Sequence, residues 1–242
     1  MTAVTRTPLV VLTGFGPFPG VAANASALLV PELACRASEL LPWARFHHEI
    51  LPTEWRQAPA RAAALIKEQR PAVLLHFGVS SRARALNLET RGRNSARMIC
   101  DDAGQLPEAP CFVAAGPEIL LTDLPVAHIA ERLRSRRVPA VISRDAGGYL
   151  CNAVLYRSLY EARHQSVPAR VGFVHLPSSL RRRRSGDHRG LSWEQAISGS
   201  LEIIAAGLGC RHAQRRPLCR ADLRAFLRER GNGKREVFLS RN

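Results

Sequence analysis

Residues 138–152 read VPAVISRDAGGYLCN and combine the signals that decide the fold. The run VPAVIS is short and largely apolar, which favours a buried β-strand. A turn at residues 145–148 ends this strand, and from Tyr149 onward apolar residues recur at helical spacing. A strand, a glycine-containing turn and a helix in this order are typical of an α/β fold.

Further apolar runs alternate with stretches of helical spacing along the chain. This alternation predicts βαβ units. We therefore expect one α/β domain with a largely parallel, mixed, twisted sheet and helices on both faces. The polar residues 89–122 fit this pattern less well and predict a loop or a short hairpin that leaves the sheet. The other expected strands are residues 7–13, 45–51, 71–78 and 170–175, and the expected helices before residue 138 are residues 26–41 and 54–70.

The composition is typical of a globular chain, with 46% apolar and 23% charged residues over a length of 242, and it excludes wholesale disorder. No stretch approaches 18 uninterrupted apolar residues, so no membrane span is expected. The apolar run near the N-terminus is interrupted at Gly14, and no cleavage pattern of a secretory signal follows it. These features predict a cytoplasmic protein without a membrane partner.

The formal net charge is +15, and two segments hold most of the excess. Residues 181–184 are consecutive arginines, and residues 211–242 contain ten basic and three acidic side chains. No aromatic residues alternate with these arginines, as they would on a base-stacking surface, so we expect a solvated face and no nucleic-acid partner. The expected α/β domain spans residues 1–216, and residues 217–242 are expected to add a basic helix and tail packed on it.

Cys151 stands out among the six cysteines because it lies in the first turn of the helix that follows the glycine turn. Backbone N–H groups without partners and the positive end of the helix dipole favour a thiolate there and sharpen its nucleophilicity. All six cysteines are expected to be reduced thiols. Cys210, His212 and Cys219 form the only cluster, and their spacing fits no zinc module, so we expect no metal.

A thiol nucleophile needs a base, and His175 ends the next expected strand in the run VGFVHLP. Ligands and reactive groups collect at the carboxyl ends of parallel strands, so Cys151 and His175 are expected on one rim of the sheet. A third group should orient the imidazole. Spacing alone leaves Glu89, Asp101 and Asp145 as alternatives for that role.

Several separated blocks of the sequence together resemble the pyroglutamyl peptidase I (pyrrolidone-carboxylate peptidase) family of cysteine peptidases. TGFGPFPGVAANAS resembles the family's amino-terminal motif, in which Thr-Gly-Phe-x-Pro-Phe-Gly-Gly is followed by Asn-Pro-Ser. The segment from Gly78 through Glu89 to Asn94 is similar to its glutamate motif, VPAVISRDAGGYLCN to its cysteine motif and VGFVHLP to its histidine block. The blocks occur in the family's order and span Thr13 to Pro177.

This resemblance implies that Cys151 is the nucleophile, that His175 is the general base and later the acid, and that Glu89 orients His175. The implied reaction is hydrolytic removal of an N-terminal pyroglutamyl (5-oxoproline) residue from a peptide through a thioester acyl-enzyme. A neutral lactam ring suits an apolar slot with a few hydrogen bonds, which the resemblance assigns to Phe15, Phe18 and Asn24. It also implies a homo-oligomer such as a tetramer, and neither a cofactor nor a metal.

The sequence departs from the family pattern around the expected pocket. Pro19 replaces a glycine, Ala25 follows Asn24 where the family has proline, and residues 90–92 differ from the family's usual sequence after the glutamate. The family places an arginine beyond Asn94, but SARMIC resembles a local insertion, so Arg97 is left unassigned. These departures keep two alternatives open. One is a related thiol hydrolase with a shifted N-terminal or amide substrate, and the other is a degenerate member that acts as a basic binding protein.

Overall fold

The computed structural model describes residues 7–18, 21, 23–180 and 190–209. Contacts between backbone positions divide the chain into residues 1–208 and 209–242, and every described helix and strand belongs to the first unit. The arginines at 181–184, the expected domain boundary at residue 216 and the basic helix and tail at 217–242 lie outside the described residues.

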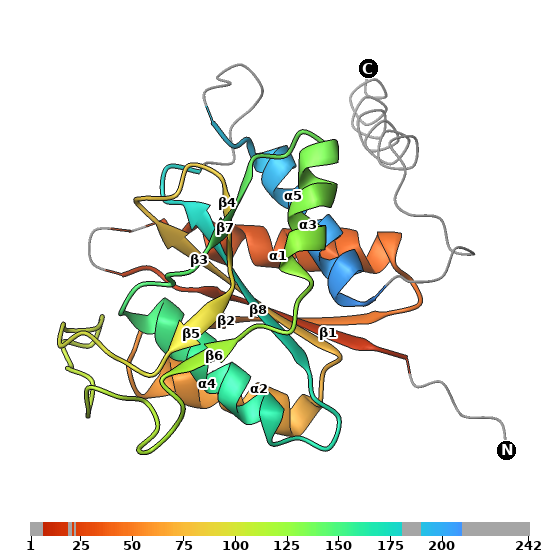
Figure 1. Cartoon of the computed structure of the whole chain (residues 1–242). Coiled ribbons are helices and arrows are strands. Elements are labelled where there is room, and N and C mark those ends of the chain that lie inside the picture. The colour runs from red at the N-terminus through yellow and green to blue at the C-terminus, as the bar shows by residue number, and fades with distance from the viewer. Residues whose placement is uncertain (1–6, 19–20, 22, 181–189, 210–242) are drawn as a thin grey trace, which may run out of the picture. The chain divides into compact units, whose positions relative to one another are not determined.

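A six-stranded sheet forms the centre of the described unit, in the order β2–β1–β3–β8–β4–β7 (Figure 1). The first four strands in this order run parallel to one another. β4 pairs antiparallel with β8 and parallel with the edge strand β7. The expectation of a largely parallel, mixed sheet is therefore confirmed. The strands are β1 (Leu9–Phe15), β2 (Arg45–Leu51), β3 (Val73–Ser80), β4 (Leu86–Glu89), β7 (Ala140–Ser143) and β8 (Arg170–Pro177).

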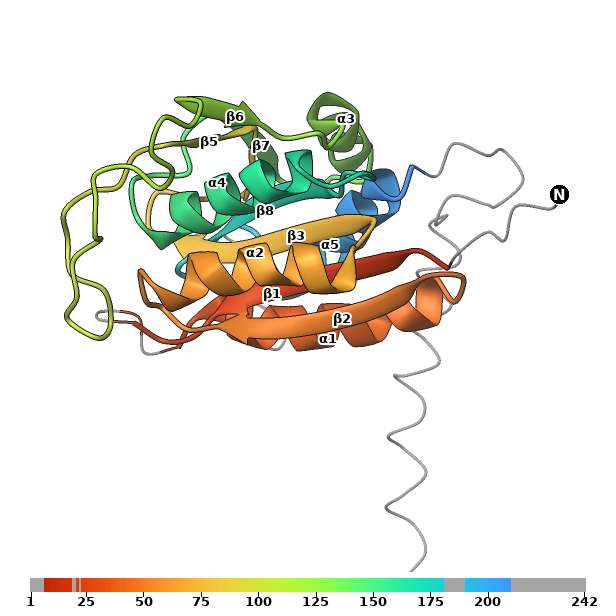
Figure 2. The same ribbon diagram turned by 90° about the horizontal axis from the view of Figure 1, so that it is seen from below.

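Helices cover both faces of this sheet, as expected. The helices α2 (Gln57–Gln69) and α4 (Leu150–Arg163) pack together on one face. The other face carries α1 (Ala25–Leu40), α3 (Val126–Ser135) and α5 (Trp193–Gly207), as the two perpendicular views show (Figures 1 and 2). None of the helices in the described part is both long and apolar enough to cross a membrane.

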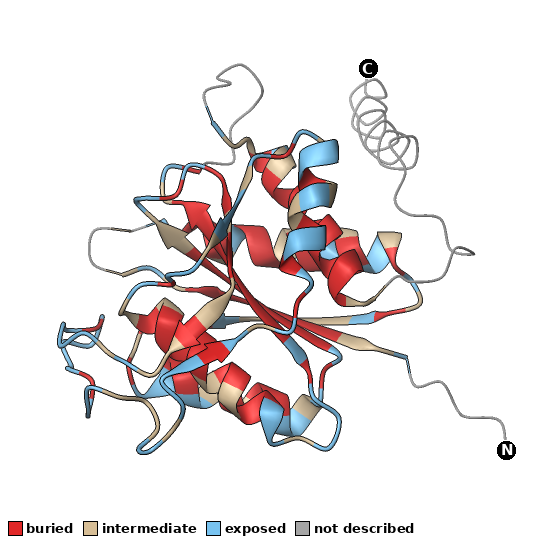
Figure 3. Cartoon of the chain, in the orientation of Figure 1, coloured by how far each residue is buried: buried red, intermediate tan, exposed pale blue. Residues whose placement is uncertain are grey.

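The core lies along the middle strands, which are buried on both faces (Figure 3). Val10, Val11 and Leu12 of β1 are fully buried, and β3 and β8 contain similar buried runs. A strand covered by helices on both sides can bury every side chain, which explains why these strands are continuous apolar runs rather than alternating ones. The edge strands β2 and β7 are more exposed.

Two elements were not foreseen. β4 is a four-residue strand in which Leu86 and Leu88 are buried, whereas Asn87 and Glu89 point to the opposite face. α5 begins with a capping box in which Ser192 and Gln195 bond each other's backbone. Within residues 89–122, β5 (Arg91–Arg93) and β6 (Ile119–Leu121) pair antiparallel, so a short hairpin stem does leave the sheet there.

His76, in the middle of β3, is a fully buried polar residue that links three elements. Its Nδ1 lies 2.7 Å from Thr13 Oγ1 on β1, and its Nε2 lies 2.9 Å from Ser158 Oγ on α4. Burial lowers the pKa of His76 to about 3, so the ring is neutral at neutral pH. His76 therefore ties α4, the helix that carries Cys151, to the centre of the sheet.

The folded protein is expected to lose stability as the pH falls below 6.5, because His76 takes up a proton in the unfolded chain but not in the folded one. The full loss from this group, reached near pH 3, is about 4–5 kcal/mol. Urea unfolding at several pH values between 7 and 4 would measure most of this loss. His76→Gln should be less stable at pH 7 and lose less stability on acidification. If the free energy of unfolding fell equally with pH in both proteins, the loss of stability could not be assigned to His76.

Candidate active site

The turn between β7 and α4 sets the position of Cys151. The Asp145 carboxylate accepts a hydrogen bond from the Gly147 N–H at 3.1 Å. Gly147 has a φ of +83°, a backbone conformation that favours glycine. Tyr149 then starts the helix without a side-chain capping bond. The first-turn N–H groups of α4 can therefore donate to an anionic group beside Cys151.

Gly78 makes room for the Cys151 sulfur. A Cβ atom at this position would lie 3.1 Å from Cys151 Sγ and 2.8 Å from Phe173 Cζ. Both distances are too short for an ordinary contact. Gly78, which ends an apolar run of the sequence, therefore leaves the space that the Cys151 sulfur occupies.

Gly78→Ala is expected to lower kcat/KM for a reaction at the Cys151 thiol, because the new methyl group must displace the sulfur or the Phe173 ring. A misplacement of about 1 Å at a reacting atom costs on the order of 10²-fold in rate. Steady-state kinetics would measure the loss, and thermal unfolding of the same variant would show that it stays folded. A folded Gly78→Ala variant with unchanged kcat/KM would rule out this role for Gly78.

His175 and Glu89 form a buried pair on neighbouring antiparallel strands. His175 Nδ1 lies 2.8 Å from Glu89 Oε1, and both side chains are almost completely buried. The other carboxylates that spacing had left open make different contacts. Asp101 accepts from the Trp55 N–H at 2.8 Å and from the N–H groups of residues 103 and 105, while Asp145 supports the turn before α4. Of the three, Glu89 contacts the imidazole.

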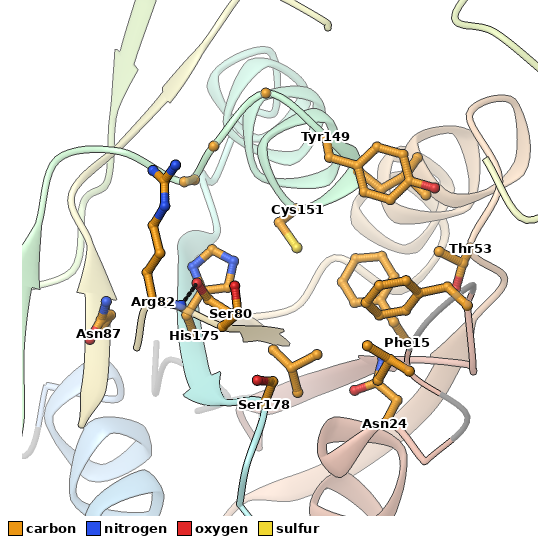
Figure 4. A pocket seen from close by; sticks show the side chains of 18 of the residues that line it. Phe15, Asn24, Thr53, Ser80, Arg82, Asn87, Tyr149, Cys151, His175 and Ser178 are labelled. Carbon is orange, nitrogen blue, oxygen red and sulfur yellow. Dashed lines mark hydrogen bonds between the residues drawn. The ribbon is translucent and has the colours of Figure 1, made fainter. Parts of the chain in front are cut away.

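The charges around His175 keep its ring protonated. Burial alone lowers the pKa of the ring. The interactions of the ring with the neighbouring Cys151, which hydrogen-bonds to it, and with the Glu89 carboxylate outweigh burial and raise the pKa to about 10. At neutral pH the imidazole is therefore a cation between a sulfur and a carboxylate. Figure 4 shows the Cys151 sulfur and the His175 ring facing the same pocket.

Cys151 and His175 lie close together, as expected. The strand before Cys151 and the strand that carries His175 were expected to be parallel, and this expectation is wrong. β7 runs antiparallel to β8, so the carboxyl ends of these two strands do not meet at one rim. The helix α4 brings the thiol to His175, because it runs back along the sheet and leads into the start of β8. Its first turn therefore lies near the carboxyl ends of β3 and β8.

A cavity of about 950 Å³ lies beside Cys151 and His175 (Figure 4). Phe15 ends β1, and its buried ring lies 6.3 Å from that of Phe173, measured between centroids. Phe18 follows in the loop and is half-buried. The predicted site residues that line the cavity are Phe15, Phe18, Asn24, Glu89, Cys151 and His175.

Asn24 uses its amide to hold the loop that carries the phenylalanines. Its Oδ1 accepts from the backbone N–H of Ser26 at 3.1 Å, which caps α1, and from the Ser26 hydroxyl. Its Nδ2 donates to the Gly16 carbonyl at 2.9 Å. These bonds fix the path of the chain between β1 and α1.

Arg97 also lines the cavity, although the sequence left it unassigned. Its N–H donates to the Gly148 carbonyl at 2.8 Å. A Cβ atom on Gly148 would lie only 2.6 Å from Arg97 Cγ, so the arginine side chain passes directly over the turn that precedes Cys151. Local spacing could not reveal this, because the contact joins the long connection between β5 and β6 to a distant turn.

Arg82 and Asn87, which the sequence did not single out, line the cavity on the same side of Cys151 as His175. Thr53 lies on the opposite side, near Phe15 (Figure 4). Tyr149 packs edge-on against Trp55, with ring centroids 5.1 Å apart. These residues come from loops or strand ends that meet only in the folded chain.

Comparisons with known proteins identify the family to which this fold and sequence are similar. The model of the family described as pyroglutamyl peptidase matches residues 9–206. The rat protein pyroglutamyl-peptidase 1 is 32% identical over 208 residues, covering 84% of this chain and 96% of its own. A pyrrolidone-carboxylate peptidase of Chromobacterium violaceum is 35% identical over 170 residues, covering 69% of this chain and 77% of its own. The structure of a mutant pyrrolidone carboxyl peptidase from Pyrococcus furiosus superposes with a TM-score of 0.72 at 26% identity, covering 83% of this chain and 98% of that one.

Proposed function

Since the chain belongs to the pyroglutamyl peptidase family, we propose that Cys151, His175 and Glu89 are its catalytic residues. The protein is a cysteine-type omega peptidase that removes an N-terminal pyroglutamyl residue from peptides. The observation that carries the residue assignment is the buried His175–Glu89 pair beside the only cysteine that lines the cavity among the described residues.

The reaction begins when the Cys151 thiolate attacks the carbonyl carbon between the lactam residue and the next amino acid. A carbon–sulfur bond forms, and an electron pair moves onto the carbonyl oxygen. The N–H groups in the first turn of α4, and Arg97, which passes over the turn before Cys151, stabilise this oxyanion. No proton moves in this step.

The tetrahedral intermediate then collapses, and the carbon–nitrogen bond breaks. His175 donates its proton to the leaving amine, which gives a thioester and a neutral imidazole. The imidazole next accepts a proton from water while the oxygen attacks the thioester carbon. Pyroglutamate leaves, and Cys151 returns as a thiolate beside protonated His175. Glu89 accepts from Nδ1 throughout and keeps Nε2 directed at the reacting atoms.

Phe15 and Phe18 form the slot for the lactam ring in this proposal. A pyroglutamyl group has no charged amine, so the carboxylate that anchors the substrate of an ordinary aminopeptidase would have no partner. Two aromatic rings suit a small neutral ring better. Asn24 contributes by holding the loop between these rings and α1.

The deciding experiment compares hydrolysis of pyroglutamyl-aminomethylcoumarin with that of the alanyl and prolyl analogues. The pyroglutamyl compound should be cleaved with by far the highest kcat/KM. A preference for either analogue would instead favour a thiol hydrolase with a shifted substrate. This alternative rests on the departures from the family motif at Pro19 and Ala25.

We also propose that the protein acts as a homo-oligomer in the cytoplasm, as the family resemblance implies. The apolar side chains of Val141 and Ile142 on the edge strand β7 support the oligomer, because about half of each is exposed in the single chain. Light scattering coupled to size exclusion would give the number of subunits.

A further inference from the structure

The order of strands gives the bound substrate a direction, if the proposed function holds. Phe15 ends β1, on one side of Cys151, whereas His175 lies on β8, on the other side. β3, with Gly78 beneath the sulfur, lies between them. The lactam ring therefore occupies the β1 side, and the amine that takes a proton from His175 leaves on the β8 side. The rest of the peptide must extend from there toward β4 (Figure 4).

The leaving side of the cavity is polar and carries a positive charge. Ser80 and Arg82, at and just beyond the end of β3, line it together with Asn87 of β4. Asn87 pairs with His175 across the two strands and lies on the same face as Glu89, two residues further on. A peptide that passes His175 therefore meets the side chains of Arg82 and Asn87.

Arg82 has no ion-pair partner among the residues that the structure describes, and the Asn87 amide has no hydrogen-bond partner there. The two carboxylates that line the cavity make other contacts. Glu89 binds His175, while Asp145 supports the turn before α4 and lies 4.0 Å from Arg93. Arg82 supplies an uncompensated guanidinium, and Asn87 supplies amide donors, both suited to a carboxylate.

We propose that Arg82, with Asn87, binds a carboxylate on the leaving part of the substrate. The preferred substrates are then pyroglutamyl peptides whose second residue is acidic, or pyroglutamyl dipeptides with a free C-terminal carboxylate. Arg82 is exposed at the rim of the cavity, so solvent screens its charge. The expected preference is about threefold to fivefold in kcat/KM at low salt, and it should shrink as salt is added.

Four substrates separate the two sources of the carboxylate. They are pGlu-Ala-NH₂ as the neutral reference, pGlu-Glu-NH₂ with an acidic side chain, pGlu-Ala with a free C-terminus and pGlu-Lys-NH₂ with the opposite charge. Release of pyroglutamate would be followed by chromatography for the wild type, Arg82→Gln and a control variant, Arg84→Gln. Arg84 is a suitable control because it is exposed, lies outside the cavity lining and bonds only the carbonyls of residues 81 and 83 among the described residues.

We expect the wild type and Arg84→Gln to prefer at least one carboxylate substrate over pGlu-Ala-NH₂, and to cleave pGlu-Lys-NH₂ most slowly. Arg82→Gln should cleave pGlu-Ala-NH₂ like the wild type and lose the preference. Equal rates for all four substrates in the wild type, or a preference that survives in Arg82→Gln, would overturn the proposal while leaving the peptidase activity established. No cleavage of any substrate would refute the proposed function itself, and the inference with it.

Discussion

Cys151→Ser is expected to abolish turnover of the pyroglutamyl substrate while leaving the protein folded. A serine hydroxyl is nearly isosteric with the thiol, so the packing against Gly78 and Phe173 is retained. The hydroxyl is a far weaker nucleophile than a thiolate, however, so attack on the carbonyl carbon is expected to fail. The expected loss in kcat is about 10⁴-fold or more. Hydrolysis assays with thermal unfolding of the same sample would measure both properties.

Iodoacetamide provides an independent readout of the same thiol. Cys35 and Cys100 are exposed, whereas Cys151 is only half-exposed, so accessibility alone predicts that Cys151 reacts after both of them. Reaction of Cys151 ahead of both would show an activated thiolate. Peptide mapping after brief labelling at neutral pH would distinguish these outcomes. Faster labelling of Cys35 and Cys100 would argue against the ion pair with His175.

Glu89→Gln is expected to lower kcat by about 10²- to 10⁴-fold. The glutamine oxygen can still accept from His175 Nδ1, but the negative charge that stabilises the imidazolium is lost. The pKa of His175 should therefore fall from about 10, and the alkaline limb of the pH–rate profile should move to lower pH. His175→Ala should lose activity about as completely as Cys151→Ser, because the members of such a unit act together.

A pH–rate profile separates this positioning role from simple damage to the fold. Glu89 Oε2 is buried without a hydrogen-bond partner in the described structure, so a glutamine N–H in its place would also lack a partner, and any cost in stability is the difference between two unsatisfied groups. That cost alone would not move the alkaline limb. Glu131→Gln, which removes an exposed carboxylate on α3, is the matched control and should leave the profile unchanged. A Glu89→Gln enzyme with most of its activity would refute the orienting role.

The buried strands could be predicted from the sequence because strands covered on both faces appear as continuous apolar runs. β1, β3 and β8 are continuous apolar runs, and the structure places each within two residues of its expected start. β4 was missed because its four residues offer only two apolar positions, although they alternate as a half-buried strand requires. The direction of β7 could not be read locally, since pairing between β4 and β8 decides it.

In the candidate site, too, some residues could be predicted from the local sequence, whereas others depend on contacts between distant parts of the chain. Local signals found Cys151 and His175, because each lies at a recognisable junction of a strand, a turn or a helix. Spacing could not choose among Glu89, Asp101 and Asp145. Only the antiparallel register of β4 and β8 brings Glu89 to the ring. Arg97 and Arg82 gave no local signal, because their neighbours in the cavity come from distant parts of the chain.

The backbone ladder holds His175 and Glu89, and the helix holds Cys151, whereas Phe18 and Arg82, which are proposed to contact the substrate, lie on connections between such elements. Part of the substrate selectivity is therefore carried by segments other than those that hold the reacting groups. Connections can exchange residues without disturbing the pairing of the strands beneath them. Relatives of this protein can thus diverge in the peptides they favour while the bond-breaking apparatus stays the same, and grafting a single connection from one relative to another should transfer the preference alone.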